Sequence, residues 1–368
     1  MNERTKQYMK GLRWLLIIPA TFLLTILAGA NPAFVEAVYS GAVYRFISFV
    51  IPFQYIPFFS FFELFLLLAP LGLLVCLVFF IVRLVRNKKN RFWRVLEAVR
   101  RALIVCGAAY FLFYAVWGLN YYRQPYSVIA DLPMEPGGDN ELYSLCEALI
   151  GKTNQAREKL PSAEDKTLDL PFSSSDLQRI TRQAYDKAYA DSLPGIGATY
   201  APAKPLVHSG LVSYTGITGI YIPFTAEPNY NNDIPMPLRG VTICHEMSHR
   251  QGFAREDEAN FIAYLVCVNA QDDYLNYSGY LLAAIHSMNQ LYAYDMVAYY
   301  ELYALYSDEV SADLAAEHIY WRTHKGNTEE AFTRMNDAYL KSHNLADGVK
   351  SYGRMVDLLL AFERAYQE

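Results

Sequence analysis

The sequence predicts a mostly helical α+β chain, in which three N-terminal membrane-spanning helices precede a domain with a small β-sheet and a helical C-terminal region. Two observations predict it. First, three apolar stretches long enough to cross a hydrocarbon core fall in the first third of the chain, at about 12–30, 58–82 and 102–119. Second, helical periodicity dominates after residue 139 and is interrupted only by short runs of β-branched and aromatic residues before residue 226.

Charge divides the chain at the same place. Residues 1–121 hold 13 Lys and Arg against 4 Asp and Glu, whereas the remainder holds 19 against 33. An acidic C-terminal two-thirds offers no electrostatic footprint for nucleic acid, so no nucleic-acid partner is expected. The division predicts a membrane domain at 1–121, a linker rich in Pro and Gly at 122–138, and a second domain at 139–368.

The basic residues predict how the spans are oriented. Lys and Arg crowd the region before the first span and the loop between the second and third, whereas only Arg45 lies between the first and second. The positive-inside rule then puts the N-terminus in the cytoplasm and everything after Leu119 outside it. The nearly uncharged stretch from Pro32 to Pro57 is expected to lie along the outer face of the bilayer as an interfacial or re-entrant segment.

The second domain is expected to be built mainly from helices. Helical periodicity or helix-start signals predict helices at 140–159, 173–190, 280–292, 296–306, 308–323, 328–342 and 352–366. Ser307 and Asn327 have the residue types that cap helix N-termini. Two short strands are expected at Pro205–Tyr214 and Gly219–Thr225, separated by Thr215-Gly216.

One stretch carries a recognisable chemistry. His245-Glu246-Met247-Ser248-His249 reads H-E-x-x-H, on a helix expected at about 237–251. Two imidazoles four residues apart share one face of a helix and can hold zinc, with the intervening carboxylate as a base. A catalytic zinc needs three protein ligands and one open position, so a third ligand should follow.

The continuation of this stretch resembles the gluzincin clan of metallopeptidases. Gly252 suits the end of the first helix, and a second helix, at about 256–270, opens with Glu256 and continues to Asn260. The clan shows E-x-x-A-[D/N] on this second helix. The resemblance makes Glu256 the third ligand and Asn260 the partner that steadies His245. Glu258 faces the same turn and is the rival ligand.

With one Zn²⁺ per chain, these residues would supply the metal ligands and the base for hydrolysis. The metal would bring the pKa of a bound water toward neutrality, and Glu246 would take the proton of that water and pass it to the leaving amine. The oxyanion needs a further donor. Tyr352, in a glycine-flanked segment, is the first choice, and Tyr221 and His208 are the alternatives. Arg255 could grip a substrate carboxylate or simply pair with a neighbouring acid.

A substrate strand is also expected. In metallopeptidases of this kind the strand before the metal-binding helix lies at the sheet edge and pairs with an extended peptide. Tyr221, Ile222 and Phe224 fall in the corresponding stretch, and Pro223 suits an edge because it lacks a ladder donor. An ordinary edge strand without such a role explains the same residues equally well.

Nearly the whole chain resembles a bacterial membrane family described as domain of unknown function 3810. The resemblance is carried by the three spans, the Gly219-Ile-Tyr-Ile-Pro223 strand, the run from Cys244 to Phe261, and the segment from Gly348 to Leu359. It implies a membrane-anchored zinc peptidase with a zincin-like domain, acting on a peptide or protein outside the cytoplasm. Two other functions remain open: a non-catalytic protein that binds peptides or cell-wall fragments, and a zinc amidase acting on cell-wall peptides. The sequence carries no signal for the oligomeric state.

Overall fold

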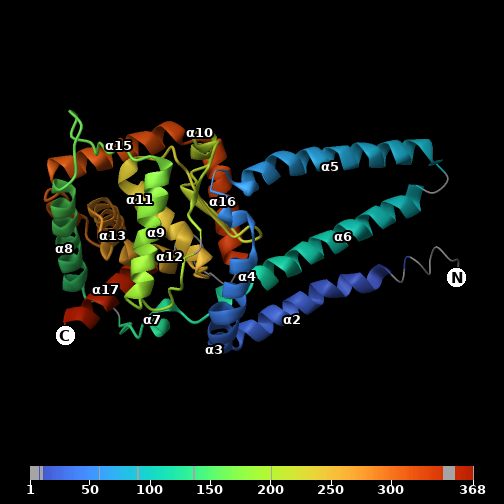
Figure 1. Ribbon diagram of the computed structural model, residues 1–368, viewed down its shortest axis with the longest axis horizontal. Coiled ribbons are helices and arrows are strands. Elements are labelled where there is room, and N and C mark those ends of the chain that lie inside the picture. Colours follow the sequence, from blue (N-terminus) through green and yellow to red (C-terminus); the bar gives the residue numbers. More distant parts are fainter. Residues whose placement is uncertain are drawn as a thin grey trace. The chain divides into compact units, whose positions relative to one another are not determined.

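The computed structural model describes residues 8, 11–57, 59–88, 91–135, 137–199, 201–342 and 353–367. The chain forms two compact units. Unit 1 comprises residues up to Val50 together with Phe61–Arg123, and unit 2 comprises Ile51–Ser60 together with Gln124 onward. Ten residues between two helices of unit 1 therefore belong to unit 2. Figure 1 shows the helices and strands of both units.

Unit 1 is entirely helical in its described part. Its helices are η1 (Arg13–Leu16), α2 (Ile17–Gly29), α3 (Pro32–Phe34), the π-helical η2 (Val35–Val43), α4 (Tyr44–Val50), α5 (Phe61–Arg86), α6 (Arg91–Val116) and η5 (Gly118–Tyr122). Gly107 of α6 lets this helix approach α2 closely, because a Cβ there would lie 2.7 Å from Ile18. In Figure 1, α2 and α6 run side by side, and the continuous α3-η2-α4 helix runs across them.

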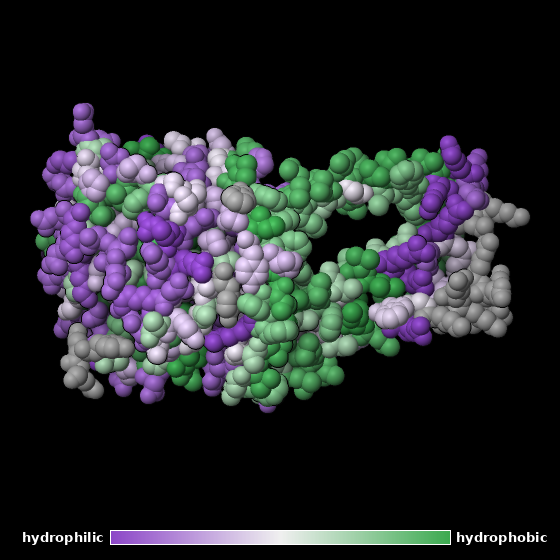
Figure 2. All heavy atoms as spheres, viewed as in Figure 1, coloured by the Kyte–Doolittle hydropathy of each residue, from purple (hydrophilic) through white to green (hydrophobic). Residues whose placement is uncertain are grey.

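Three helices of unit 1 are long and apolar enough to cross a membrane: Pro32–Val50, Phe61–Arg86 and Arg91–Val116. The last two contain most of the predicted spans 58–82 and 102–119. Figure 2 shows hydrophobic side chains along both of them, with hydrophilic side chains gathered where α5 ends and α6 begins. Length and composition therefore indicate a membrane protein.

The N-terminal prediction differs in detail from the structure. The expected first span, 12–30, corresponds to a shorter apolar helix, Arg13–Gly29, whereas Pro32–Val50 has the length and composition of a span although an interfacial role was expected for it. This helix is held to the end of α6: the Tyr39 hydroxyl donates to the carbonyls of Tyr114 and Ala115, at 3.2 and 3.1 Å.

Unit 2 is built around three helices that bury half or more of their residues: α11 (Met236–Arg250), α12 (Glu256–Val268) and α13 (Asp273–Tyr294). Around them lie α8 (Asp139–Glu158), α9 (Ser174–Ala190), α14 (Met296–Tyr303), α15 (Asp308–His324), α16 (Asn327–Ser342) and α17 (Gly353–Gln367). Eleven of the thirteen residues of α12 are buried, so this helix is the centre of the hydrophobic core.

Caps explain where several of these helices start. The hydroxyl of Ser173 accepts the backbone N–H of Asp176 and that of Ser307 accepts Val310, as residues of this type do at an N-cap. The predicted cap at Ser307 is thereby confirmed. Asn327, predicted as a cap, is instead the first residue of α16. The predicted helices at 140–159, 308–323 and 352–366 match α8, α15 and α17 to within one or two residues.

The sheet has three strands in the order β1 (Lys204–Pro205), β3 (Glu227–Tyr230), β2 (Gly219–Ile222), with β1 parallel and β2 antiparallel to β3. The predicted strand at Pro205–Tyr214 is wrong, because this stretch holds the short helix α10 (Ser209–Ser213). The side chain of Ser209 satisfies backbone groups on both sides of the turn, accepting Asn232 N–H and donating to Leu206 C=O, and this local bonding overrides the β-branched composition.

The stretch expected as a linker also differs from the expectation. The short helix α7 (Tyr126–Ile129) lies within it, and the Tyr126 ring is only 1% exposed, with Phe253 and Phe261 at centroid distances of 5.6 and 5.7 Å. An aromatic side chain of this size contributes substantially to a core. Part of 122–138 is therefore packed into unit 2 rather than extended between domains.

Candidate metal centre

The H-E-x-x-H residues lie in the last turns of α11, on a helix held firmly from behind. Tyr185 of α9 donates its hydroxyl hydrogen bond to the carbonyl of Cys244 at 2.6 Å and also contacts the Ser248 hydroxyl at 2.8 Å. Gly252, at φ +87°, follows in the left-handed conformation that ends a helix and turns the chain toward α12. The backbone is thus fixed on both sides of the two histidines.

The structure brings His245, His249 and Glu256 together. One potential ligand atom from each of the three lies within 4.8 Å of the others, and among the described residues this is the group of three such side chains that could hold a metal. The carboxylate of Glu256 lies 3.2 Å from His245 Nε2 and 3.7 Å from His249 Nε2. Two neutral imidazoles and one carboxylate form a donor set of the kind that zinc accepts.

Hydrogen bonds fix which imidazole nitrogen faces the centre. Nδ1 of His245 lies 2.7 Å from the amide oxygen of Asn260, and Nδ1 of His249 lies 2.7 Å from the carbonyl oxygen of Phe253. An acceptor at Nδ1 requires the proton to be there, which leaves the Nε2 lone pair available to a metal. Asn260 reaches His245 because it lies one turn after Glu256 on the same face of α12.

The charges around the centre favour a cation. Although burial opposes it, the Glu256 carboxylate raises the pKa of His249 to about 9. Burial would raise the pKa of Glu256, but the two imidazoles outweigh it and lower that pKa well below its ordinary value. Glu256 is therefore a carboxylate at neutral pH, whereas His249 holds a proton that a metal ion would displace on binding.

Glu246 is buried beside this cluster, and its Oε2 atom has no hydrogen-bond partner. Burial raises its pKa to about 7, an effect that the neighbouring imidazoles partly offset. A carboxyl group with a pKa near neutrality can take up and release a proton at physiological pH. The unbonded oxygen is available to accept a proton.

Glu258, the rival ligand, lies elsewhere. Its Oε1 atom accepts the backbone N–H of Tyr126 at 2.9 Å and Arg255 Nη1 at 2.7 Å. Positions 256 and 258 point to different faces because successive residues turn by about 100° around a helix. Glu258 therefore holds the α7 segment and Arg255, and the alternative in which Arg255 pairs with a neighbouring acid is the one observed.

Strand β2 covers the H-E-x-x-H turn. A Cβ at Gly219 would lie 2.5 Å from Glu246 Oε1, so only glycine allows this approach, and the Tyr221 ring lies 6.5 Å from the His249 ring between centroids. Successive side chains alternate along a strand, which is why Gly219 and Tyr221 face the site while Ile222 faces the other way. Phe224, beyond the strand, is 46% exposed.

The expected edge position of β2 is confirmed by the strand order. Asn231 N–H donates to Thr218 C=O, and bonded pairs alternate along an antiparallel ladder. With the register Gly219↔Tyr230 and Tyr221↔Pro228, the backbone groups of Gly219 and Tyr221 point away from β3. The edge nearest the candidate metal centre therefore presents backbone groups outward.

One residue near the centre had no role in the sequence analysis. His286 of α13 interacts electrostatically with His245, and burial together with that interaction lowers its pKa to about 4. It lies 41 residues after His245 in an otherwise ordinary helix, so no local pattern distinguishes it. The expected oxyanion donor Tyr352 lies outside the described residues.

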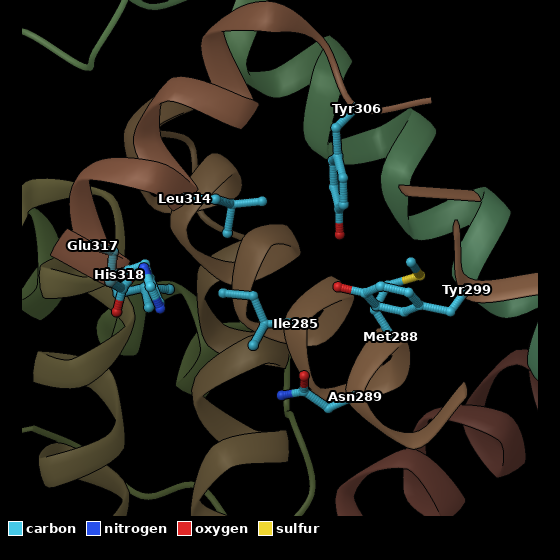
Figure 3. A pocket seen from close by; sticks show the side chains of 9 residues that line it. Ile285, Met288, Asn289, Tyr299, Tyr306, Leu314, Glu317 and His318 are labelled. Atoms are coloured by element: carbon cyan, nitrogen blue, oxygen red, sulfur yellow. The ribbon is translucent and has the colours of Figure 1, made fainter. Parts of the chain in front are cut away.

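A separate cavity of about 250 Å³ lies between α11, α13, α14 and α15 (Figure 3). In Figure 3 the hydroxyls of Tyr299 and Tyr306 point into it. The Glu317 carboxyl group also lines it: Trp321 donates to its Oε1 atom at 3.4 Å, and its Oε2 atom is buried without a hydrogen bond. Burial raises the pKa of Glu317 to about 7.

The chain matches one known protein family. The model of the family described as "Protein of unknown function (DUF3810)" matches residues 39–360. The chain belongs to this family. No curated protein and no solved structure matches it. The match extends over both units and includes the metal cluster, strand β2 and most of α17.

Proposed function

We propose that this chain is a membrane-anchored, zinc-dependent metallopeptidase that hydrolyses peptide bonds on the extracytoplasmic side of the membrane. The observation that carries the proposal is a pair of hydrogen bonds that fixes the orientation and tautomer of His245 and His249. Asn260 and the Phe253 carbonyl hold the Nδ1 atoms of both histidines, so that both Nε2 atoms face Glu256. A carboxylate that faces two Nε2 atoms attracts a proton or a cation, and a divalent metal is the occupant that can bind all three side chains at once.

In a zincin-like site, each of these residues has one task. The order H-E-x-x-H, then Glu256 and Asn260 on the next helix, resembles that of gluzincins, although the six residues between His249 and Glu256 are fewer than many gluzincins have. A bound zinc ion supplies a Lewis acid that activates water and polarises a carbonyl group. Glu246 accepts the proton of the attacking water and returns it to the leaving nitrogen, a task suited to a carboxyl group with a pKa of about 7.

The substrate lies along β2 in this proposal. The outward backbone groups of Gly219 pair with an extended peptide, as an added strand does at a sheet edge. Gly219 borders Glu246, so a peptide paired there passes directly over the base. Ile222 and Phe224 flank the path and contact substrate side chains.

Tyr221 and His286 are the described candidates for the donor that stabilises the oxyanion. Tyr221 packs beside His249, and His286 interacts with His245 from the opposite helix. Removal of such a donor costs about 10²–10³-fold in kcat in a comparable hydrolase. Tyr221→Phe and His286→Asn, compared side by side, assign the role to whichever variant shows that loss with metal content unchanged.

Orientation follows from the distribution of Lys and Arg. The basic loop between α5 and α6 faces the cytoplasm under the positive-inside rule, and unit 2 faces outward. A reporter enzyme fused after Glu368 tests this: activity is expected only for a reporter that works outside the cytoplasm, and activity of a cytoplasmic reporter would reverse the orientation.

The proposed activity is tested by digesting a peptide library with the full chain in detergent, with and without a chelator. Cleavage is expected in the untreated sample, no cleavage after chelation, and recovery on adding zinc. A matched Glu246→Gln sample should hold zinc without cleaving. Binding of library peptides without cleavage by the wild type would instead support the non-catalytic alternative and overturn the proposal.

A further inference from the structure

The segment Ile51–Ser60 is tied to the sheet of unit 2 by a buried charge. Lys204 of β1 is fully buried and forms an ion pair with Glu227 of β3, which is also fully buried. The same ammonium group donates to the carbonyls of Phe53 and Phe59, at 2.8 and 3.3 Å. A buried ammonium group needs this number of acceptors, and removing them would leave an uncompensated charge. The segment is therefore firmly attached to the sheet.

The same segment exposes apolar side chains next to a candidate membrane span. Phe53, Tyr55, Ile56 and Phe59 are 38–43% exposed. Phe61, two residues after Phe59, begins α5, whose 26 residues correspond to about 39 Å of helix, enough to cross a hydrocarbon core. By chain connectivity alone, the segment lies at the membrane face where α5 enters.

A second apolar surface lies close by on the same unit. Val207, Leu211 and Tyr214 lie just before, within and just after the short helix α10 and are 68, 70 and 51% exposed; we call them the apolar face of α10. Val207 comes three residues after Lys204, so it lies within about 11 Å of the residue that holds the segment. Three large apolar side chains within eight residues thus remain exposed near the segment.

We propose that the segment Ile51–Phe59 and the apolar face of α10 form one surface that inserts into the lipid bilayer. The occupant is the membrane rather than a protein because the segment continues directly into α5. Apolar and aromatic side chains without intervening acidic groups are suited to the boundary between headgroups and acyl chains. The surface is continuous with the membrane contact already expected for the chain.

This surface also defines the substrate class, an inference that rests on the proposed function. Ile222, at the end of β2, is paired with Glu227, and Glu227 contacts Lys204, which holds the segment. The end of β2, along which the substrate is proposed to bind, is therefore linked through Glu227 and Lys204 to the segment proposed to contact the lipid. The substrate is a membrane-anchored polypeptide, cleaved in the extended stretch next to the bilayer.

The membrane contact can be measured on the full chain in phosphatidylcholine nanodiscs. Single cysteines at positions 207 and 211 carry a spin label, in a background where the exposed Cys76 and Cys106 are serine and the three buried cysteines remain. Val297 of α14, 71% exposed against 70% for Leu211, is the matched control position. Oxygen, which concentrates in lipid, and a water-soluble nickel complex serve as relaxing agents.

Labels at 207 and 211 are expected to be several-fold more accessible to oxygen than to nickel, with the opposite ratio at 297. Equal nickel accessibility at 211 and 297 would overturn the membrane contact. Protection of 211 from both agents would also overturn it, because it would indicate that protein, such as a second copy of this chain, covers the surface.

The substrate class is tested with one peptide from the library digest, offered free in solution or attached to a lipid through a short spacer. In nanodiscs the anchored form is expected to be cleaved at least tenfold faster, and Leu211→Asp, but not Val297→Asp, should reduce that advantage. Equal rates would sink the substrate inference while the peptidase stands. No cleavage of either form would sink the proposed function and leave the spin-label result unaffected.

Discussion

Two clusters of charged groups in unit 2 are completed differently. Arg157 and Asp313 are both 1% exposed; one carboxylate oxygen of Asp313 accepts Arg157 and the Tyr277 hydroxyl, and the other accepts the N–H of Leu168. Protein donors thus satisfy the whole carboxylate. In the cluster of His245, His249 and Glu256 the protein instead holds the two Nδ1 atoms and leaves both Nε2 atoms facing the carboxylate.

The difference separates a structural cluster from a ligand site. A closed network contributes to folding and needs nothing else, whereas ligand groups that face one another leave a position that a cation can fill. Mutations are therefore expected to have opposite consequences in the two clusters. Changes in the closed cluster should reduce stability without touching metal, and changes in the open cluster should do the reverse.

The largest expected effect is on turnover. Glu246→Gln removes the proposed proton acceptor while keeping the size of the side chain, and should lower kcat by roughly 10²–10⁴-fold with zinc content unchanged. Steady-state cleavage of a library-derived peptide measures it. Full activity in this variant would exclude Glu246 as the base.

The closed cluster should respond in stability instead. Arg157→Leu leaves the Asp313 carboxylate buried without its cation and is expected to reduce the free energy of unfolding by about 3–5 kcal/mol. Chemical denaturation of unit 2, followed by fluorescence of the full chain in detergent, gives the value. At temperatures where the variant is folded, its zinc content should equal that of the wild type. Loss of zinc from the folded variant would show that the Arg157–Asp313 cluster also affects metal binding, against the proposed difference.

The partner of His245 should have a smaller, metal-specific effect. Asn260→Ala removes the acceptor at Nδ1 and is expected to weaken zinc affinity about 10–100-fold, as changes to groups behind a metal ligand do. Competition with a fluorescent chelator measures the affinity. Glu258→Gln is the control on the same helix, since Glu258 contacts Tyr126 and Arg255, and its affinity should stay within a factor of a few.

The smallest effect is expected for Glu317. Its hydrogen bonding is intermediate between that of the two clusters, because one of its carboxyl oxygens accepts a hydrogen bond and the other does not. Its pKa in the folded protein, about 7, lies above the ordinary 4.5. The contribution of this group to the free energy of unfolding is therefore largest at low pH and falls as pH rises from 4.5 to 7. Glu317→Gln should therefore gain about 2 kcal/mol relative to wild type between pH 5.5 and 8. A constant difference across this range would show that the carboxyl group is solvated.

The helices, and the proximity of His245, His249 and Glu256, were the parts best predicted from the sequence. The spacing of His245 and His249 is a property of one helix, and the glycine turn that follows is local, so both helices of the site were located to within two residues. Helix geometry alone could not decide whether Glu256 or Glu258 faces the two histidines. The answer depends on the rotation of α12 about its axis, which in turn depends on the residue at which the helix begins.

Features that depend on packing were missed. Tyr126 was assigned to a linker, and only the aromatic pocket formed by Phe253 and Phe261 explains its burial. The strand expected at Pro205–Tyr214 became α10 through side-chain bonds to Ser209. His286 comes under the electrostatic influence of His245 because α13 packs against α11, and no local pattern in the sequence encodes that packing.

The most direct test of the account is the zinc content of the purified full chain, measured by elemental analysis after dialysis against buffer with micromolar zinc, for wild type and Glu256→Gln in parallel. The account predicts about one zinc per chain in the wild type and near zero in the variant, with both folded by circular dichroism. A wild type without zinc, or a variant that retains it fully, would contradict the central claim that these three side chains form a metal centre.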